Sequence, residues 1–161
     1  MTMMRSRGLT LEVDASLRGV VALGWLEATG VSAEPLPEAF AHERDAVLAA
    51  LIARAAGRPA AELPGVAENR AMFHRLGVDP TKTRPSSEAL LRRVLQGKGL
   101  PTILPAVDAC NLASLEHQMP LGLYDRDQVQ QAVFARMGRI GEGYEGIRKG
   151  FVNLSMRPLL A

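Results

Sequence analysis

The first part of the chain carries two apolar runs that predict β-strands. Residues 9–13 alternate apolar and polar side chains, and residues 20–23 are continuously apolar. Alternation places every second side chain on one face of a strand, whereas a short continuous run is typical of a strand buried on both faces. Pro35 and Pro37 then interrupt the pattern, so we expect the opening strands to end before them.

Four stretches in the middle of the chain repeat apolar residues with helical spacing and predict helices. They cover residues 38–56, residues 66–76, the segment from Pro85 to Gly97, and residues 103–118. The third is the clearest, because Leu90, Leu91, Val94 and Leu95 form one stripe that leaves Arg92 and Arg93 on the other side. Proline suits a helix start and glycine a helix end.

The last part of the chain changes back to short alternating runs, at residues 121–124, 133–136 and 151–154. Helices between strand regions, without a repeated strand–helix–strand unit, predict the α+β class. The length of 161 residues predicts a single domain, 1–161. Residues 141–146 fit the letters G-x-G-x-x-G, but a strand-like run follows where a dinucleotide site needs a helix. A turn between strands is the better interpretation, and no cofactor is expected.

Composition excludes several classes of protein. No stretch approaches the roughly 18 apolar residues of a membrane span, and no apolar segment follows Arg5 and Arg7 as in a secretory signal. Cys110 is the only cysteine, which excludes an internal disulfide and a multi-cysteine zinc site. We therefore expect a cytoplasmic protein with no metal site and no membrane partner.

Positive charge is concentrated in one block. Between Arg70 and Lys98 seven cations stand against Asp79 and Glu88, a local net charge of +5 on a chain whose total is +2. Such a block suits an anionic partner, and a solvated helix face is the alternative. Hydroxyl groups beside a predicted helix start add donors for an anion, although capping alone also explains them. The candidate RNA-binding residues are Lys82, Arg84, Ser86, Ser87, Arg92, Arg93 and Lys98.

The fourth predicted helix carries a polar stripe. Asp108 and Asn111 are three residues apart, which makes them neighbours on one helix face, and Ser114 follows at the same interval. Such a stripe is either buried and hydrogen-bonded or lines a pocket, and the sequence leaves both open.

Four ordered motifs resemble stand-alone proteins of the B3/B4 type. They are residues 84–93, 97–101, 107–111 and 120–125. That domain also occurs in the β subunit of bacterial phenylalanyl-tRNA synthetase, where it edits mischarged tRNA. The resemblance covers about residues 15–161. It implies a β-sandwich-like core with flanking helices, a function related to RNA, and a pocket for an aminoacyl group, in which Asn111 is the best match to a pocket residue. We assign Asp108, Asn111, Ser114, Gly122 and Tyr124 to that pocket.

Two positions depart from the synthetase pattern. Gly122 stands where the synthetase has a histidine, and the family continues beyond the segment matching residues 157–161 into strands that hold a pocket glutamate. Catalytic residues are therefore unassigned, and any enzymatic activity would be hydrolysis of an aminoacyl-tRNA ester. The missing strands also predict self-association, or a partner that completes the sheet.

The first expectation is thus a domain that binds tRNA or aminoacyl-tRNA. One alternative is a trans-acting hydrolase of mischarged aminoacyl-tRNA. Another is a small-molecule-binding or interaction protein that kept the fold. The basic block favours the first over the last.

Overall fold

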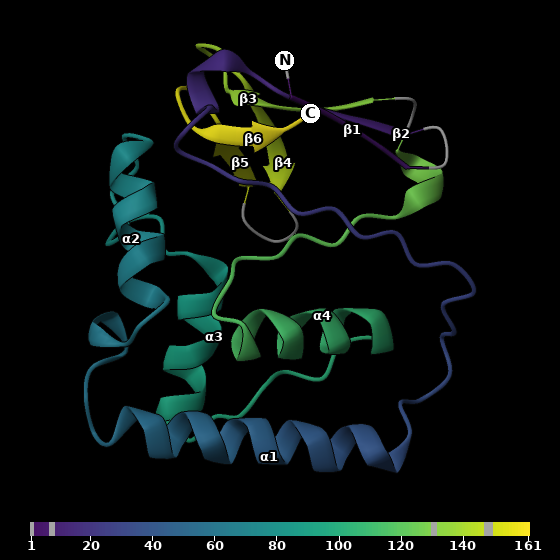
Figure 1. Ribbon diagram of the computed structural model, residues 1–161, viewed down its shortest axis with the longest axis vertical. Helices are drawn as coiled ribbons and strands as arrows, with labels where there is room; N and C mark the ends of the chain where they lie inside the picture. Colours follow the sequence, from purple (N-terminus) through teal and green to yellow (C-terminus); the bar gives the residue numbers. More distant parts are fainter. Residues whose placement is uncertain (1, 7–8, 130–131, 147–149) are drawn as a thin grey trace. The chain divides into compact units, whose positions relative to one another are not determined.

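The computed structural model describes residues 2–6, 9–129, 132–146 and 150–161 (Figure 1). The chain divides into two compact units. The first, here called the sheet unit, comprises Met1–Glu27, Met72–Val78 and Tyr124–Ala161. The second, called the helical unit, comprises Ala28–Ala71 and Asp79–Leu123.

The sheet unit is built on a four-stranded sheet in the order β1-β2-β3-β6. Its strands are β1 (Thr2–Ser6), β2 (Leu9–Val13), β3 (Ala132–Met137) and β6 (Pro158–Leu160). β2 pairs antiparallel with β1 and parallel with β3, while β6 pairs antiparallel with β3. The β2 register places Thr10 beside Ala132 and Val13 beside Ala135, so the sheet joins residues from the two ends of the sequence. Its core includes Leu17, Leu76, Val78 and Ala135.

A two-stranded antiparallel ribbon completes the sheet unit. β4 (Gly143–Gly146) pairs with β5 (Gly150–Asn153), and Tyr144 lies opposite Val152. The strands predicted at 9–13, 133–136 and 151–154 are therefore confirmed as β2, β3 and β5. The G-x-G-x-x-G segment was expected to be a turn between strands, but only its first two residues precede the strand, and residues 143–146 form β4 itself.

Two predicted strands are wrong, and three strands (β1, β4 and β6) were missed. Residues 20–23 begin in a turn and pair with no strand among the described residues. Val20, Val21 and Leu23 instead pack directly against the core of the sheet unit, which explains their apolar character. Residues 121–124 are also irregular, and Leu121, Leu123 and Tyr124 are exposed. Of the missed strands, β1 and β6 are the edges of the four-stranded sheet, and β4 belongs to the two-stranded ribbon.

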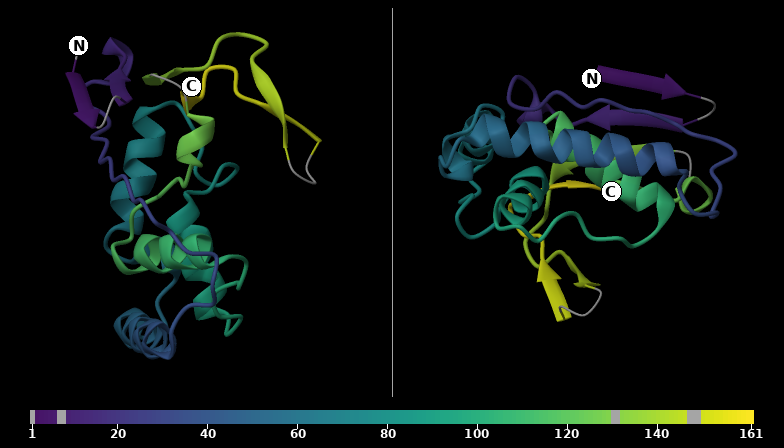
Figure 2. Two further views of the ribbon diagram at one scale, coloured as in Figure 1. Left: turned by 90° about the vertical axis from the view of Figure 1, so that its right-hand side faces the viewer. Right: turned by 90° about the horizontal axis from the view of Figure 1, so that it is seen from below.

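The helical unit contains α1 (Glu38–Ala55), most of α2 (Val66–Arg75), α3 (Ser86–Leu95) and α4 (Pro105–Glu116), and all four predicted helices are confirmed. The unit boundary falls within α2, between Ala71 and Met72. α1, α3 and α4 contact one another, and the short 3-10 turn η2 (Ala60–Glu62) packs on α3. Figure 2 shows the long α1 end-on in its left view and lengthwise in its right view. Leu51, Leu63, Leu91 and Leu115 form the centre of the core.

Helices in one part of the chain and small sheets in another confirm the α+β class. Two further 3-10 turns, η1 (Ala15–Leu17) and η3 (Arg126–Gln128), lie in the sheet unit. None of the described helices has the length and hydropathy needed to cross a bilayer. β1 and β6 are the edge strands of the larger sheet, and the expected pairing of such an edge with a second chain stays a prediction.

Candidate nucleic-acid interface

Helix α3 is amphipathic, and its burial pattern divides it into two faces. Leu91 and Val94 are buried in the core of the helical unit. Arg93 and Gln96 are exposed and Arg92 is half-buried, as their positions off the apolar stripe predicted. The helix begins after Pro85, and Gly97 lies just beyond its end with a positive φ of 73°. Proline and glycine thus fix the length of the face that α3 presents.

A depression of about 420 Å³ lies along this face. Its lining is strongly basic and consists of Arg84, Ala89, Arg92, Arg93, Gln96 and Lys98. Four of the predicted RNA-binding residues therefore surround one hollow: Arg84, Arg92, Arg93 and Lys98. Grouped cations of this kind raise the local concentration of anions.

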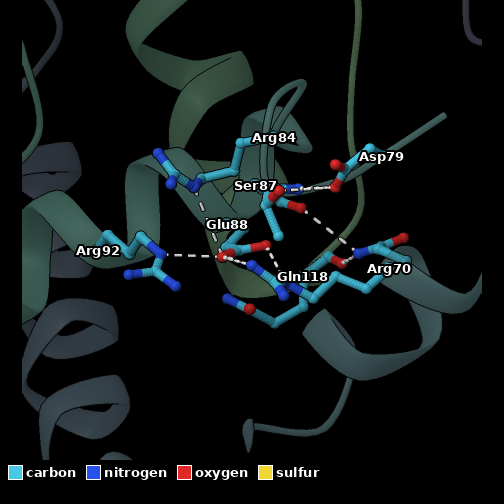
Figure 3. A network of polar contacts seen from close by, with 9 residues as sticks. Arg70, Asp79, Arg84, Ser87, Glu88, Arg92 and Gln118 are labelled. Carbon is cyan, nitrogen blue, oxygen red and sulfur yellow. Dashed lines mark hydrogen bonds and ion pairs between the residues drawn. The ribbon is translucent and has the colours of Figure 1, made fainter. Parts of the chain in front are cut away.

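Glu88 contacts two of the lining arginines, Arg84 and Arg92, and also Arg70, and its side chain is fully buried. Its carboxylate accepts hydrogen bonds from Arg70 Nε (2.8 Å), Arg70 Nη2 (3.0 Å) and Arg92 Nε (2.8 Å). Arg84 Nε lies 3.6 Å from Oε1 of the same carboxylate. Figure 3 shows the arginines converging on Glu88.

The charge of Glu88 is maintained by these arginines. Burial alone would raise the pKa of the Glu88 carboxyl, but hydrogen bonds from Arg70 and Arg92 outweigh burial and lower this pKa below its ordinary value. The same contact raises the pKa of Arg70. Glu88 is therefore a stable anion among three guanidinium groups.

The cluster keeps a positive charge after this pairing. Five cations (Arg70, Arg84, Arg92, Arg93 and Lys98) stand against Glu88 and against Asp79, whose charge also acts on Arg70, so a net charge of +3 remains. The Lys98 ammonium donates to Gln96 Oε1 at 2.9 Å, which leaves its charge uncompensated. Arg93 makes no ion pair with any residue that the structure describes. Arg93 and Lys98 are thus the cations most available to an external anion.

The other predicted RNA-binding residues lie outside the lining of the depression. Lys82 is exposed in the turn before α3, and Ser86 is exposed at its first residue. Ser87 is fully buried, and its Oγ accepts a hydrogen bond from Asn69 Nδ2 at 3.4 Å. Its hydroxyl therefore faces the interior of the helical unit.

The residues assigned to an aminoacyl pocket lie on α4 and on the segment after it. Asp108 Oδ1 accepts from the Ile103 backbone N–H at 2.9 Å, and the Ser114 hydroxyl donates to the Met119 carbonyl at 2.6 Å. These bonds hold the chain at the two ends of α4. Asn111 is half-buried between them and has no hydrogen bond within the described residues. Gly122 and Tyr124 are both exposed, the former in the helical unit and the latter in the sheet unit.

With this geometry established, comparisons with known proteins identify the family. The family model described as the B3/4 domain matches residues 68–158, which is more than half of the chain. The chain belongs to the B3/4 domain family. This family occurs in phenylalanyl-tRNA synthetase β subunits. Comparison with curated proteins and with solved structures gave no match.

The B3/4 match includes most of α2 and all of α3 and α4, and with them the basic depression and the polar residues of α4. It does not include α1 or β2, which contribute to the two cores. Among the residues that the structure describes, no three histidine, cysteine or acidic side chains are grouped as a metal site would require.

Sequence reasoning missed the central place of Glu88 and the contribution of Arg70. One signal was present, because Arg84, Glu88 and Arg92 are spaced at four-residue intervals and therefore share a helix face. Arg70 lies 18 residues before Glu88, on α2, so its contact depends on how two helices pack. A second missed contact joins Asn69 Nδ2 to the Gln118 carbonyl at 2.6 Å.

Proposed function

We propose that this B3/4 protein binds tRNA or aminoacyl-tRNA through the basic depression on α3. One observation carries the proposal: four cationic side chains surround a single hollow, and the carboxylate of Glu88, which contacts two of them, is fully buried. An anion entering the hollow would meet cations at its surface, with the carboxylate behind them.

The chemistry of the lining favours a phosphodiester backbone. Guanidinium groups bind phosphate oxygens with paired N–H donors, and several such contacts release counterions from the nucleic acid. The lining contains no aromatic side chain on which a base could stack. We therefore infer that contacts here recognise the backbone rather than the bases. Membership of a family found in a tRNA synthetase subunit supports tRNA as the nucleic acid.

The proposal is tested by removing the two cations without a carboxylate partner. In the Arg93→Ala/Lys98→Ala double variant we expect weaker tRNA binding in a fluorescence titration. We also expect the slope of log affinity against log salt to fall by about two, since each phosphate contact contributes roughly one. Arg18→Ala/Arg54→Ala is the matched control, because it removes the same charge from exposed positions outside the depression.

Equal effects of the two double variants would show that only total charge matters and would contradict an α3 site. Titrations with charged and uncharged tRNA, with release of the amino acid measured in parallel, separate a binding protein from a trans-acting hydrolase. Binding without release supports the proposed function. Release that depends on this protein supports the hydrolase alternative.

A further inference from the structure

The position of Glu88 is unusual for a residue of a basic surface. It lies four residues after Arg84, which precedes α3, and one helical turn before Arg92. Its side chain is fully buried, while those two are 42% and 36% exposed. The acidic group therefore sits beneath the cations of the depression. A buried charge costs free energy to desolvate, and its partners must compensate for this cost.

The two lining arginines approach Glu88 in the same way. Arg92 directs Nε to the carboxylate at 2.8 Å, and Arg84 places its own Nε at 3.6 Å (Figure 3). Within the described residues, no hydrogen bond donated by their terminal nitrogens is found. Each group therefore has one edge held by Glu88 and another edge available for an anion.

Arg70 supports this arrangement from outside the lining. Its two hydrogen bonds engage both oxygens of Glu88, which fixes the plane of the carboxylate. A fixed carboxylate defines where the neighbouring guanidinium groups lie, and less side-chain entropy is then lost when a ligand binds.

We propose that Glu88 is a positioning residue that orients Arg84 and Arg92 toward a phosphate group in the depression. This inference rests on the proposed function and deepens it, because it assigns phosphate recognition to an oriented pair of arginines. Lys98, which has no such anchor, contributes charge without a fixed direction.

Orientation and charge predict opposite results for Glu88→Gln. The substitution removes a negative charge beside the depression, so an effect of charge alone would strengthen binding of an anion. Loss of orientation weakens binding instead, because the carboxylate that holds two guanidinium groups is gone. We expect tRNA affinity to fall about tenfold, the effect of losing an oriented charged hydrogen bond. Glu116→Gln, at an exposed position on α4, is the matched control for the change in charge.

A second pair of variants keeps the charge constant and covers the case in which Glu88→Gln fails to fold. Arg92→Lys and Arg93→Lys are adjacent conservative changes, but only Arg92 contacts Glu88. We expect the loss of tRNA affinity to be clearly larger for Arg92→Lys than for Arg93→Lys. A thermal melt of each variant establishes that the protein is folded at the assay temperature.

The outcomes separate the two proposals. If the wild-type protein binds no tRNA, the proposed function fails and this inference fails with it. If the wild type binds but Glu88→Gln matches or exceeds the affinity of Glu116→Gln, the positioning role is wrong and RNA binding stands. Should Glu88→Gln not fold, equal losses in the two lysine variants would overturn the positioning role.

Discussion

Arg70 holds both oxygens of Glu88, with Nε 2.8 Å from Oε2 and Nη2 3.0 Å from Oε1. The contact joins α2 to α3 through a fully buried acid and an arginine that is 23% exposed. A bidentate pair of this geometry is among the stronger polar contacts available to a protein. It stabilises the helical unit and holds the carboxylate that Arg84 and Arg92 of the depression contact.

Removal of the buried acid is expected to destabilise the protein. Glu88→Ala leaves Arg70 and Arg92 without their carboxylate and opens space beneath α3, so we expect the free energy of unfolding to fall by about 3 kcal/mol. Urea denaturation measures this change. Glu38→Ala is the control, because its carboxylate is 89% exposed and lies 3.9 Å from His42. Such an exposed pair contributes little, so an equal loss in both variants would contradict the importance of the buried contact.

Stability in acid is expected to depend on Glu142. Hydrogen bonds from Arg136 and from the Arg139 backbone lower the pKa of the Glu142 carboxyl from 4.5 to about 2. Since the folded state binds the proton less tightly than the unfolded state, this stabilisation is complete above about pH 4.5 and is lost as the pH falls toward 2. Glu142→Gln should therefore flatten the pH dependence of the unfolding free energy between these values.

Urea denaturation at several pH values checks this prediction, with Glu145→Gln as the comparison. Glu145 is exposed on β4 and forms no ion pair within the described residues. The wild type should lose more stability than Glu142→Gln on acidification, and Glu145→Gln should follow the wild type. Parallel curves for all three proteins would mean that the ion pair with Arg136 does not persist in solution.

Gly138 is expected to tolerate no side chain. A Cβ at this buried position would collide with the backbone carbonyl oxygen of Leu154, which cannot move without disturbing the turn that follows β5. We expect Gly138→Ala to lower the free energy of unfolding by about 1–3 kcal/mol, the usual cost of overpacking. Gly24→Ala is the matched control, since nothing lies within 4 Å of its added methyl group. A neutral Gly138→Ala would show that this part of the backbone adjusts easily.

The polar residues of α4 are expected to separate into structural and binding roles. Ser114→Ala removes the buried donor to the Met119 carbonyl and should cost about 1–3 kcal/mol of stability. Asn111→Ala removes an amide that forms no hydrogen bond within the described chain, so its stability should change little. If Asn111 serves an aminoacyl pocket, its replacement lowers the affinity for aminoacyl-tRNA. Thermal melts with and without an aminoacyl analogue test both variants, and a large loss of stability in Asn111→Ala would indicate a structural amide instead.

The helices could be predicted from sequence because their signals are local. The stripe containing Leu91 and Val94, with proline before it and glycine after it, defined α3 almost to the residue. Residues 20–23 are equally apolar but form no strand, and they pack against the core of the sheet unit instead. The pattern could not distinguish the two cases, because burial against a core and pairing in a sheet select the same apolar side chains. Strand pairing depends on a distant partner that the pattern does not contain.

The candidate site could likewise be predicted only where its signal is local in the sequence. Clustered cations on α3 were visible in the sequence, and the depression brings four of them together. The burial of Ser87 and the hub formed by Glu88 were not visible, because both depend on the packing of α2 against α3. A charge count treated Glu88 as one acid among several cations, whereas its burial makes it the anchor for three of them.

The parallel pairing of β2 with β3 has a consequence for the order of folding. Thr10 and Ala132 are neighbours in the sheet although about 120 residues separate them, so a long loop must close before this pairing forms. The helical unit needs no such closure, since its core spans only Leu51 to Leu115. During synthesis, Leu9 and Leu11 of β2 leave the ribosome long before β3 does. Until β3 is synthesised, β2 lacks the parallel neighbour with which it pairs in the sheet. We therefore expect the helices to fold first, and the sheet to be the last part of the nascent chain that a chaperone has to protect.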